Sequence, residues 1–352
     1  MATRSLTAAQ ARLLKAGTVI PAHPLALDAS RQLDERRQRA LTRYYLAAGA
    51  GGVAVGVHTT QFEIRDVGLL EPVLRLAAET VDAEVGDRPF LKVAGVLGER
   101  DQALREAELA SSLGYDLALL SLRGLEQYSE AQLIAHSRAV SEVMPIVGFY
   151  LQTAVGGRRF SRAFWRDLAE LPGLLAIKIA PFDRYATLDV VRAVAESSRP
   201  HDIALYTGND DNILVDLLTP FHVRVGDAVK ELRIVGGLLG QWAVWTKAAV
   251  ELLEEVKVAR ELPDMPLELL TRAARLTAAN AAVFDAANRF HGVIAGVHEV
   301  LRRQGLLEGI WCLDPEEGLS PGQAAELDRV YREHPDLTDD AFVAQHLADW
   351  LR

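Results

Sequence analysis

The sequence predicts an α/β fold, a (β/α)8 TIM barrel followed by a C-terminal helical extension. Short apolar runs alternate with amphipathic stretches from residue 17 to residue 260, which is the pattern of parallel strands connected by helices. The glycine fingerprint GxGxxG, which often follows the first strand of an open doubly wound sheet, is missing. Beyond Glu261 the pattern is helical only. Together these observations favour a closed barrel over an open sheet, with helices after it.

Eight short apolar segments are the predicted strands. In chain order they cover residues 17–21, 52–57, 90–96, 116–121, 145–150, 174–179, 202–207 and 231–236. Each has five to seven residues, which is the usual length of a buried strand. Eight such strands, each followed by a helix, close a barrel.

The helices are predicted in the amphipathic stretches that follow the strands. They cover residues 31–48, 68–85, 99–113, 130–143, 161–170, 184–198, 210–219 and 240–260. Ser129 and Ser161 stand at the start of two of these stretches. At such a position a hydroxyl accepts a hydrogen bond from an N–H group of the first helical turn, so we expect both serines to be N-caps.

The chain is divided near residue 260 into two predicted parts. Residues 1–260 form the barrel that carries the active site, and residues 261–352 form the helical extension. Helices are expected in the extension at residues 266–304 and 321–351, separated by a loop rich in glycine, proline and aspartate. Because the extension lacks strands, we expect it to serve packing or oligomerisation rather than catalysis.

Composition and charge exclude several classes of protein. The 352 residues carry 48 acidic and 38 basic side chains, a formal net charge of −10. Such a charge repels phosphate backbones and anionic lipid, so we expect no nucleic-acid partner. The longest uncharged apolar stretch, residues 44–57, is too short to cross about 30 Å of hydrocarbon, so no membrane span is expected. The first sixteen residues lack the apolar core of a secretory signal, and we expect a cytoplasmic location.

A lysine and a tyrosine stand at the ends of two predicted strands. Lys178 ends the apolar run 174–177, and Tyr150 ends the run 145–149, 28 residues earlier. Residues at the C-terminal ends of barrel strands point into the mouth where the chemistry takes place. A neutral lysine can form an imine with a carbonyl compound, and a nearby tyrosine hydroxyl can transfer the protons that this reaction requires. The pair therefore predicts imine chemistry.

The surroundings of Lys178 in the sequence suit a neutral amine. Its neighbours from residue 174 to residue 182 are apolar, and the first acidic residue after it is Asp183. An apolar pocket without a nearby carboxylate lowers the pKa of a lysine. Both residues also have a simpler interpretation: Lys178 can extend out of a strand end into water, and Tyr150 can be an aromatic residue of the core.

Two polar loops follow other predicted strands. His58, Thr59 and Thr60 come after the second strand, where backbone N–H groups and hydroxyls can hold a carboxylate and relay protons. Threonine pairs are also common in ordinary loops. After the seventh strand, Gly208 permits close backbone approach, and Asn209 and Asp210 can contact substrate hydroxyls. The alternative for this second loop is a turn that caps the following helix.

The sequence predicts no metal site. His23 and His58 fall near predicted strand ends, but no ligand spacing of a known metal motif is present. The one cysteine, Cys312, cannot form an internal disulfide or a cysteine metal cluster, and we expect it to be a small buried residue.

With these residues in place, the chain resembles the dihydrodipicolinate synthase and N-acetylneuraminate lyase superfamily, the class I Schiff-base pyruvate lyases. The resemblance covers about residues 16–245. It rests on these segments: IPAHPLALD, GAGGVAVG followed by Thr59 and Thr60, PIVGFY ending in Tyr150, LLAIK ending in Lys178, and LYTGNDD around Gly208. The spacing between Tyr150 and Lys178 is also similar to that of the family.

The resemblance implies a mechanism and an assembly. Lys178 would form an imine with a 2-oxo acid such as pyruvate, Tyr150 would shuttle protons, and Thr59 and Thr60 would hold the carboxylate. No cofactor is implied, and family members are usually homo-oligomers, here expected to be a dimer or a tetramer. Such enzymes make or break a carbon–carbon bond next to C3, or remove water from a deoxy-keto acid.

Several departures from the family pattern indicate that the chain is not a true dihydrodipicolinate synthase. The usual GTTGE signature is replaced by GVHTTQ, and by the resemblance His58 would occupy part of the carboxylate site. The asparagine and proline expected after the tyrosine are Leu151 and Thr153, and Val155 stands where the synthase has an arginine for its aldehyde substrate.

Three hypotheses about function follow. The first is a cofactor-independent aldolase-type lyase in which Lys178 forms an imine with a 2-oxo acid and an aldehyde is released or added. The second is a dehydratase of keto-deoxy sugar acids, favoured if residues 209–211 contact hydroxyl groups. The third, from another class, is a non-catalytic barrel that keeps the lysine and binds a keto acid.

Overall fold

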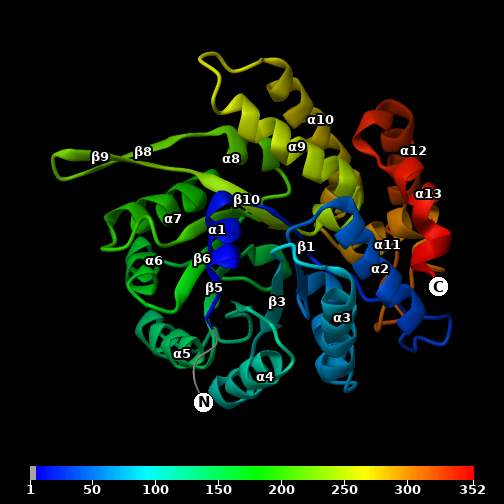
Figure 1. Cartoon of the computed structure of the whole chain (residues 1–352), viewed down its shortest axis with the longest axis horizontal. Helices are drawn as coiled ribbons and strands as arrows, with labels where there is room; N and C mark the ends of the chain where they lie inside the picture. Colours follow the sequence, from blue (N-terminus) through cyan, green and yellow to red (C-terminus); the bar gives the residue numbers. More distant parts are fainter. Residues whose placement is uncertain (1–4) are drawn as a thin grey trace. The chain divides into compact units, whose positions relative to one another are not determined.

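The computed structural model describes residues 5–352 and contains an eight-stranded parallel sheet (Figure 1). Its strands are β1 (Val19–Pro21), β2 (Gly52–Val55), β3 (Leu91–Val96), β4 (Leu117–Leu120), β5 (Ile146–Leu151), β6 (Leu174–Ala180), β7 (Ala204–Thr207) and β10 (Ile234–Leu239). Their order in the sheet is β1-β10-β7-β6-β5-β4-β3-β2. The predicted fold class, a (β/α)8 barrel with a C-terminal helical extension, is confirmed.

The predicted helices are present; the helix over residues 130–143 has the predicted bounds and the others are shorter than predicted. They are α2 (Glu35–Ala48), α3 (Leu70–Glu84), α4 (Arg100–Ser112), α5 (Glu130–Val143), α6 (Arg162–Ala169), α7 (Arg184–Glu196), α8 (Ile213–Leu218) and α9 (Thr246–Ala259). Both predicted N-caps are confirmed, because the hydroxyls of Ser129 and Ser161 accept hydrogen bonds from backbone N–H groups of α5 and α6. None of the helices within residues 5–352 combines the length and the apolar character that a membrane span requires.

Two elements before β10 differ from the prediction. Helix α1 (Ala8–Ala16) begins with a capping box formed by Thr7 and Gln10 and was not expected. An antiparallel hairpin of β8 (Phe221–Val225) and β9 (Ala228–Leu232) was also missed. It lies against α7, where Lys230 Nζ donates a hydrogen bond to the carbonyl oxygen of Ala195 (2.7 Å), and it forms a long arm in Figure 1. Because β9 takes residues up to 232, the last barrel strand begins three residues later than predicted.

The C-terminal segments are helical, as predicted, but both are interrupted. They form α10 (Glu268–Val283), α11 (Val293–Arg303), α12 (Gln323–Glu333) and α13 (Asp340–Trp350). Between α10 and α11, Asp285 has a positive φ of 56°. Its carboxylate accepts hydrogen bonds from Gly292 N (2.9 Å) and Ser320 Oγ (2.5 Å), which stabilises the break.

The described chain forms two compact units. One contains the chain up to Thr18 together with Pro89–Leu238, and the other contains Val19–Arg88 and Leu239–Arg352. In the second unit the C-terminal helices pack against α2 and α9. The buried hydroxyl of Tyr44 donates to Asp339 Oδ2 (2.7 Å) and accepts from Thr246 N (2.7 Å). The predicted boundary near residue 260 between barrel and extension stays a prediction.

Candidate active site

Lys178 lies near the C-terminal end of β6, between β5 and β7. Its partners in the sheet register are Phe149 on one side and Tyr206 on the other. Because side chains of paired residues in neighbouring strands point to the same face, these three form one row. The Nζ atom of Lys178 lies 4.4 Å from the centroid of the Phe149 ring. The side chain of Lys178 is 8% exposed, so it does not extend out of the strand end into water.

Burial and one carboxylate control the protonation of Lys178. Burial disfavours the charged form and lowers the pKa of Lys178 to about 8, while the nearby negative charge of Asp210 raises it. The expectation that no carboxylate lies close to this amine is therefore wrong. Asp210 is itself 8% exposed and follows β7 rather than β6. With a pKa of about 8, part of the Lys178 population is neutral just above neutral pH. The carboxylate of Asp210 can stabilise a positive charge at the same position.

Gly208 allows Lys178 to occupy its position. A Cβ atom on Gly208 would lie 2.7 Å from Lys178 Cε and 2.7 Å from Ala180 Cβ. Both distances are shorter than any normal contact between carbon atoms, so a side chain at position 208 would displace the lysine. Gly208 N also donates a hydrogen bond to the carbonyl oxygen of Ile179 (2.7 Å), which fixes the backbone there.

A buried polar network holds the loop after β7. Asp216, which is 1% exposed, accepts hydrogen bonds from Thr207 Oγ1 (2.7 Å) and Asn209 Nδ2 (2.9 Å), and it forms an ion pair with Arg184. Asn209 Oδ1 accepts a hydrogen bond from Phe182 N (3.0 Å), so this amide joins the loops after β6 and β7. Asn209 is fully buried, and both ends of its amide are used within the protein. In this arrangement the amide fixes the loop that carries Gly208 and Asp210, and a role for Asn209 as a substrate ligand stays a prediction.

The structure does not bring Tyr150 and Lys178 together. Tyr150 is paired with Ile179, the neighbour of Lys178, and so points to the opposite face of the sheet. Its ring lies 4.9 Å from the ring of Trp165 on α6, centroid to centroid. Burial raises the pKa of its hydroxyl. In this arrangement Tyr150 is an aromatic residue of the layer between sheet and helix, and its role in proton transfer stays a prediction.

We expect replacement of Tyr150 by phenylalanine to reduce turnover by less than about tenfold, because its ring packs against Trp165 of α6 and Tyr150 pairs with Ile179 rather than with Lys178. A group that transfers a proton in the reaction contributes roughly a hundredfold or more. Steady-state turnover of the Tyr150→Phe variant measures the difference. A loss of a hundredfold or more with unchanged thermal stability would instead support the role that the sequence predicts.

The loop after β2 belongs to the second unit and is held by its own hydrogen bonds. Thr59 Oγ1 donates to the carbonyl oxygen of Ala22 (2.8 Å). Thr60 Oγ1 donates to the carbonyl oxygen of His23 (2.7 Å) and accepts from Gly56 N (3.0 Å). Both hydroxyl protons are thus used to connect β2 with the segment after β1.

The roles that the sequence predicts for this loop are therefore untested. Carboxylate binding by Thr59 and Thr60 stays a prediction. His58 is partly exposed, and its ring lies 5.8 Å from the ring of Phe62, centroid to centroid. A role for His58 in substrate binding stays a prediction too.

His23, the other histidine near a strand end, is committed to structural contacts. Its Nε2 lies 2.9 Å from Thr42 Oγ1, and its Nδ1 lies 2.9 Å from Gln38 Nε2. Complete burial lowers the pKa of His23 to about 4. Within residues 5–352 no group of three or more histidine, cysteine or acidic side chains has the arrangement of a metal site.

Sequence reasoning missed two residues of the first unit. Tyr206 shares the face of Lys178. Its hydroxyl donates a hydrogen bond to the carbonyl oxygen of Leu14 (2.9 Å), so this side chain connects β7 with α1. Asp216 anchors the loop after β7. A signal for Asp216 was available, because it is the one charged residue in the otherwise apolar segment ILVDLL, and a carboxylate on a buried helix face requires partners.

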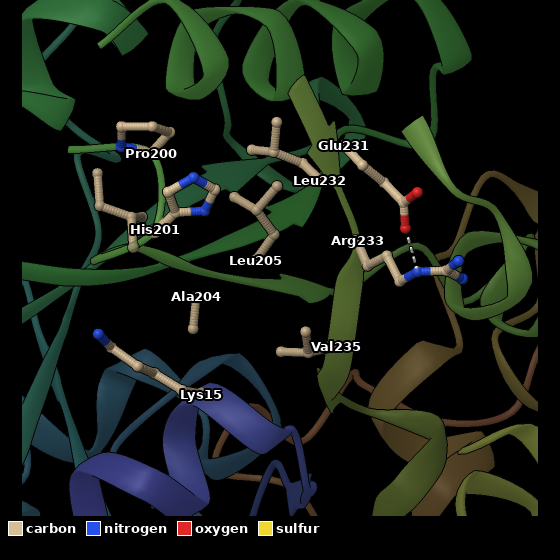
Figure 2. A pocket seen from close by; sticks show the side chains of 10 residues that line it. Lys15, Pro200, His201, Ala204, Leu205, Glu231, Leu232, Arg233 and Val235 are labelled. Carbon is tan, nitrogen blue, oxygen red and sulfur yellow. Dashed lines mark hydrogen bonds and ion pairs between the residues drawn. The ribbon is translucent and has the colours of Figure 1, made fainter. Parts of the chain in front are cut away.

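A cavity of about 150 Å³ lies elsewhere in the first unit, near the starts of β7 and β10 (Figure 2). Lys178, Gly208 and Asp210 are not among the residues that line it. Its charged groups are already paired, Arg233 with Glu231 (2.8 Å) and Lys15 with Asp202 (3.5 Å). This cavity is therefore not part of the lysine site.

Comparisons with known proteins agree with this picture. No family model matches the chain. The chain is 28% identical over 211 residues to N-acetylneuraminate lyase of Citrobacter koseri, covering 59% of this chain and 67% of that protein. It is 23% identical over 326 residues to N-acetylneuraminate lyase 2 of Escherichia coli O6:H1, covering 90% and 95% respectively.

Solved structures show the same fold. Dihydrodipicolinate synthase from Oceanobacillus iheyensis matches with a TM-score of 0.72 and 17% identity, covering 92% of this chain and 98% of that one. N-acetylneuraminate lyase from Fusobacterium nucleatum matches with a TM-score of 0.71 and 15% identity, covering 91% and 99%.

Proposed function

The chain belongs to the dihydrodipicolinate synthase and N-acetylneuraminate lyase superfamily, and we propose that it is an aldolase-type lyase that acts on a 2-oxo acid such as pyruvate through an imine on Lys178. The observation that carries the proposal is the buried amine of Lys178, whose pKa is lowered to about 8. A buried lysine without a structural purpose is costly, whereas a partly neutral lysine is the nucleophile that imine formation requires.

The proposed reaction begins with attack of the neutral Lys178 amine on the keto carbon of the substrate. The carbinolamine then loses water to give a protonated imine, which draws electrons from the bond next to C3. As the C3–C4 bond breaks, the hydroxyl group on C4 gives up its proton and becomes the carbonyl group of the released aldehyde, and an enamine remains on Lys178. Protonation of the enamine at C3 and addition of water return the 2-oxo acid and the free lysine.

Two features of the first unit support individual steps. The carboxylate of Asp210 acts on Lys178 electrostatically, and it would stabilise the cationic imine in the same way. The network of Asp216 and Asn209 fixes the loop that carries Asp210 and Gly208, so these groups need no rearrangement when the cation forms. The alternative of a dehydratase gains no support from Asn209, because its amide is used within the protein.

A panel of substrates tests the proposal. Incubation with N-acetylneuraminate and with shorter keto-deoxy sugar acids, followed by enzymatic measurement of pyruvate, should detect cleavage of at least one compound. Formation of a 2-oxo semialdehyde without pyruvate would identify a dehydratase instead. Thermal stabilisation by pyruvate without turnover of any compound would identify the non-catalytic keto-acid-binding barrel.

We expect the pH dependence of imine formation to move to lower pH when Asp210 is replaced by asparagine. In the wild type the neutral fraction of Lys178 increases as pH rises through about 8. Because the carboxylate raises the pKa of Lys178, its removal lowers that pKa and moves the midpoint below the wild-type value. The rate of pyruvate trapping by borohydride, measured between pH 6 and pH 10 in about half-unit steps, gives both midpoints.

Asp227→Asn, a change in the exposed turn of the β8–β9 hairpin, is the control and should leave the midpoint where it is. An unchanged or higher midpoint for Asp210→Asn would show that this carboxylate does not act on Lys178.

A further inference from the structure

A second cavity lies between helices α4 and α5 and has a volume of about 200 Å³. It is lined by Glu99, Arg100, Leu125, Tyr128, Gln132, Leu133, Ala135 and His136. Leu125 and Leu133 are fully buried and provide apolar surface in the lining. Apolar cavities of about 150 Å³ hold molecules the size of benzene, so this one has room for a ring or a branched aliphatic group.

One polar group of this cavity has no partner within the protein. His136 is 8% exposed, and its Nε2 atom forms no hydrogen bond with any described residue. Buried polar groups are normally hydrogen-bonded, because an unpaired one costs about 1–3 kcal/mol. Burial and the positive charge of Arg100 lower the pKa of His136, so its ring is neutral near pH 7 and carries one N–H donor. A ligand with an acceptor oxygen would satisfy this nitrogen.

The one arginine of the lining forms no ion pair with a described residue. This residue, Arg100, is exposed. It is the first residue of α4, and the side chain of the N-cap residue Glu99 does not cap the helix. The N–H groups of the first turn therefore lack a side-chain cap and can contribute to anion binding, although Asp101 in the same turn carries a negative charge. Glu99 also lines the rim, and its negative charge disfavours ligands with more than one negative charge.

We propose that the cavity between α4 and α5 is a binding site for a small monocarboxylate with an aromatic or branched aliphatic body. The carboxylate is bound by the Arg100 guanidinium and the first turn of α4. The apolar body rests on Leu125 and Leu133, and the Nε2 atom of His136 donates to a carboxylate oxygen. The site is separate from Lys178 and uses no imine chemistry.

Calorimetric titration of the full chain with benzoate tests the proposal at about pH 7. We expect saturable binding to one site with a Kd in the millimolar range or tighter. Benzyl alcohol lacks the charge and acetate lacks the apolar body, so each should bind at least about tenfold more weakly. If benzoate bound no more tightly than benzyl alcohol, the proposed role of the carboxylate charge would be wrong.

Three variants locate the bound benzoate. Arg100→Gln should weaken binding at least about tenfold, whereas Arg105→Gln, another exposed arginine of α4, should leave the Kd within about twofold. Lys178→Met should also bind benzoate like the wild type. Absence of saturable binding, equal binding by Arg100→Gln, or loss of binding in Lys178→Met would each overturn the proposal, and none of these results bears on turnover at Lys178.

Discussion

Replacement of Lys178 by methionine is expected to reduce turnover by about a thousandfold or more, because it removes the nucleophile of the proposed reaction. Methionine has a similar length and is suited to the apolar contact with the Phe149 ring, 4.4 Å from the lysine nitrogen in the wild type. The loss should therefore come from chemistry and not from unfolding. Steady-state kinetics with the best compound of the substrate panel measures it.

The same substitution should stabilise the fold by about 1–3 kcal/mol near pH 7. The pKa of Lys178 is lowered to about 8 in the folded chain, so the unfolded chain binds the proton more tightly. Lys178 therefore destabilises the folded chain, and this destabilisation is at its full value below pH 8. It decreases as pH rises toward the pKa of a solvated lysine, about 10.4. Chemical denaturation at two pH values measures it, and the gain should be smaller at the higher pH.

The control is Lys257→Met on α9, where the lysine forms an ion pair with Glu254 (2.8 Å). This variant should keep turnover within about twofold of the wild type. If Lys178→Met kept its turnover while remaining folded, the nucleophile would have to be another group, and the imine mechanism would be wrong.

Replacement of Gly208 by alanine is expected to reduce turnover by about a hundredfold or more while the chain still folds. The new Cβ atom would lie 2.7 Å from both Lys178 Cε and Ala180 Cβ. The lysine side chain is the part that can move most easily, so the amine is displaced from its place beside Phe149. A displacement of about 1 Å at a reacting group is enough for a hundredfold loss.

Gly318→Ala is the matched control, because nothing lies within 4 Å of a Cβ at that position and its φ is not positive. It should leave both turnover and melting temperature unchanged. For Gly208→Ala, the rate of imine trapping should decrease together with turnover. Wild-type trapping in a folded Gly208→Ala variant would show that the loop after β7 does not control the position of Lys178.

Much of the fold was predictable from sequence because its elements are set by local patterns. The apolar runs, the amphipathic stretches and the N-cap serines 129 and 161 each indicate an element without knowledge of the rest of the chain. The β8–β9 hairpin was missed although its first segment, FHVRV, alternates with a period of two and is separated from the second, AVKEL, by a Gly–Asp turn. The prediction instead assigned residues 231–236 to a single barrel strand, which includes the end of β9.

The candidate site was predictable only in part, because faces and neighbours depend on the register of the sheet. Strand β5 is buried on both faces, so the segment IVGFYL shows no alternation that separates the face of Phe149 from that of Tyr150. Only the pairing with β6 shows that Phe149, not Tyr150, shares the face of Lys178. The effect of Asp210 on Lys178 also connects the loop after β7 with β6, and no local sequence pattern indicates such an interaction.

Reduction with borohydride in the presence of pyruvate tests the imine on Lys178 without knowledge of the natural substrate. We predict that the intact protein gains the mass of one reduced pyruvate adduct, located after proteolysis on the peptide that contains Lys178. The peptide that contains Lys92, another buried lysine of the barrel strands, should remain unmodified. An adduct on other lysines only, or no adduct at a pH where Lys178 is largely neutral, would contradict the proposed chemistry.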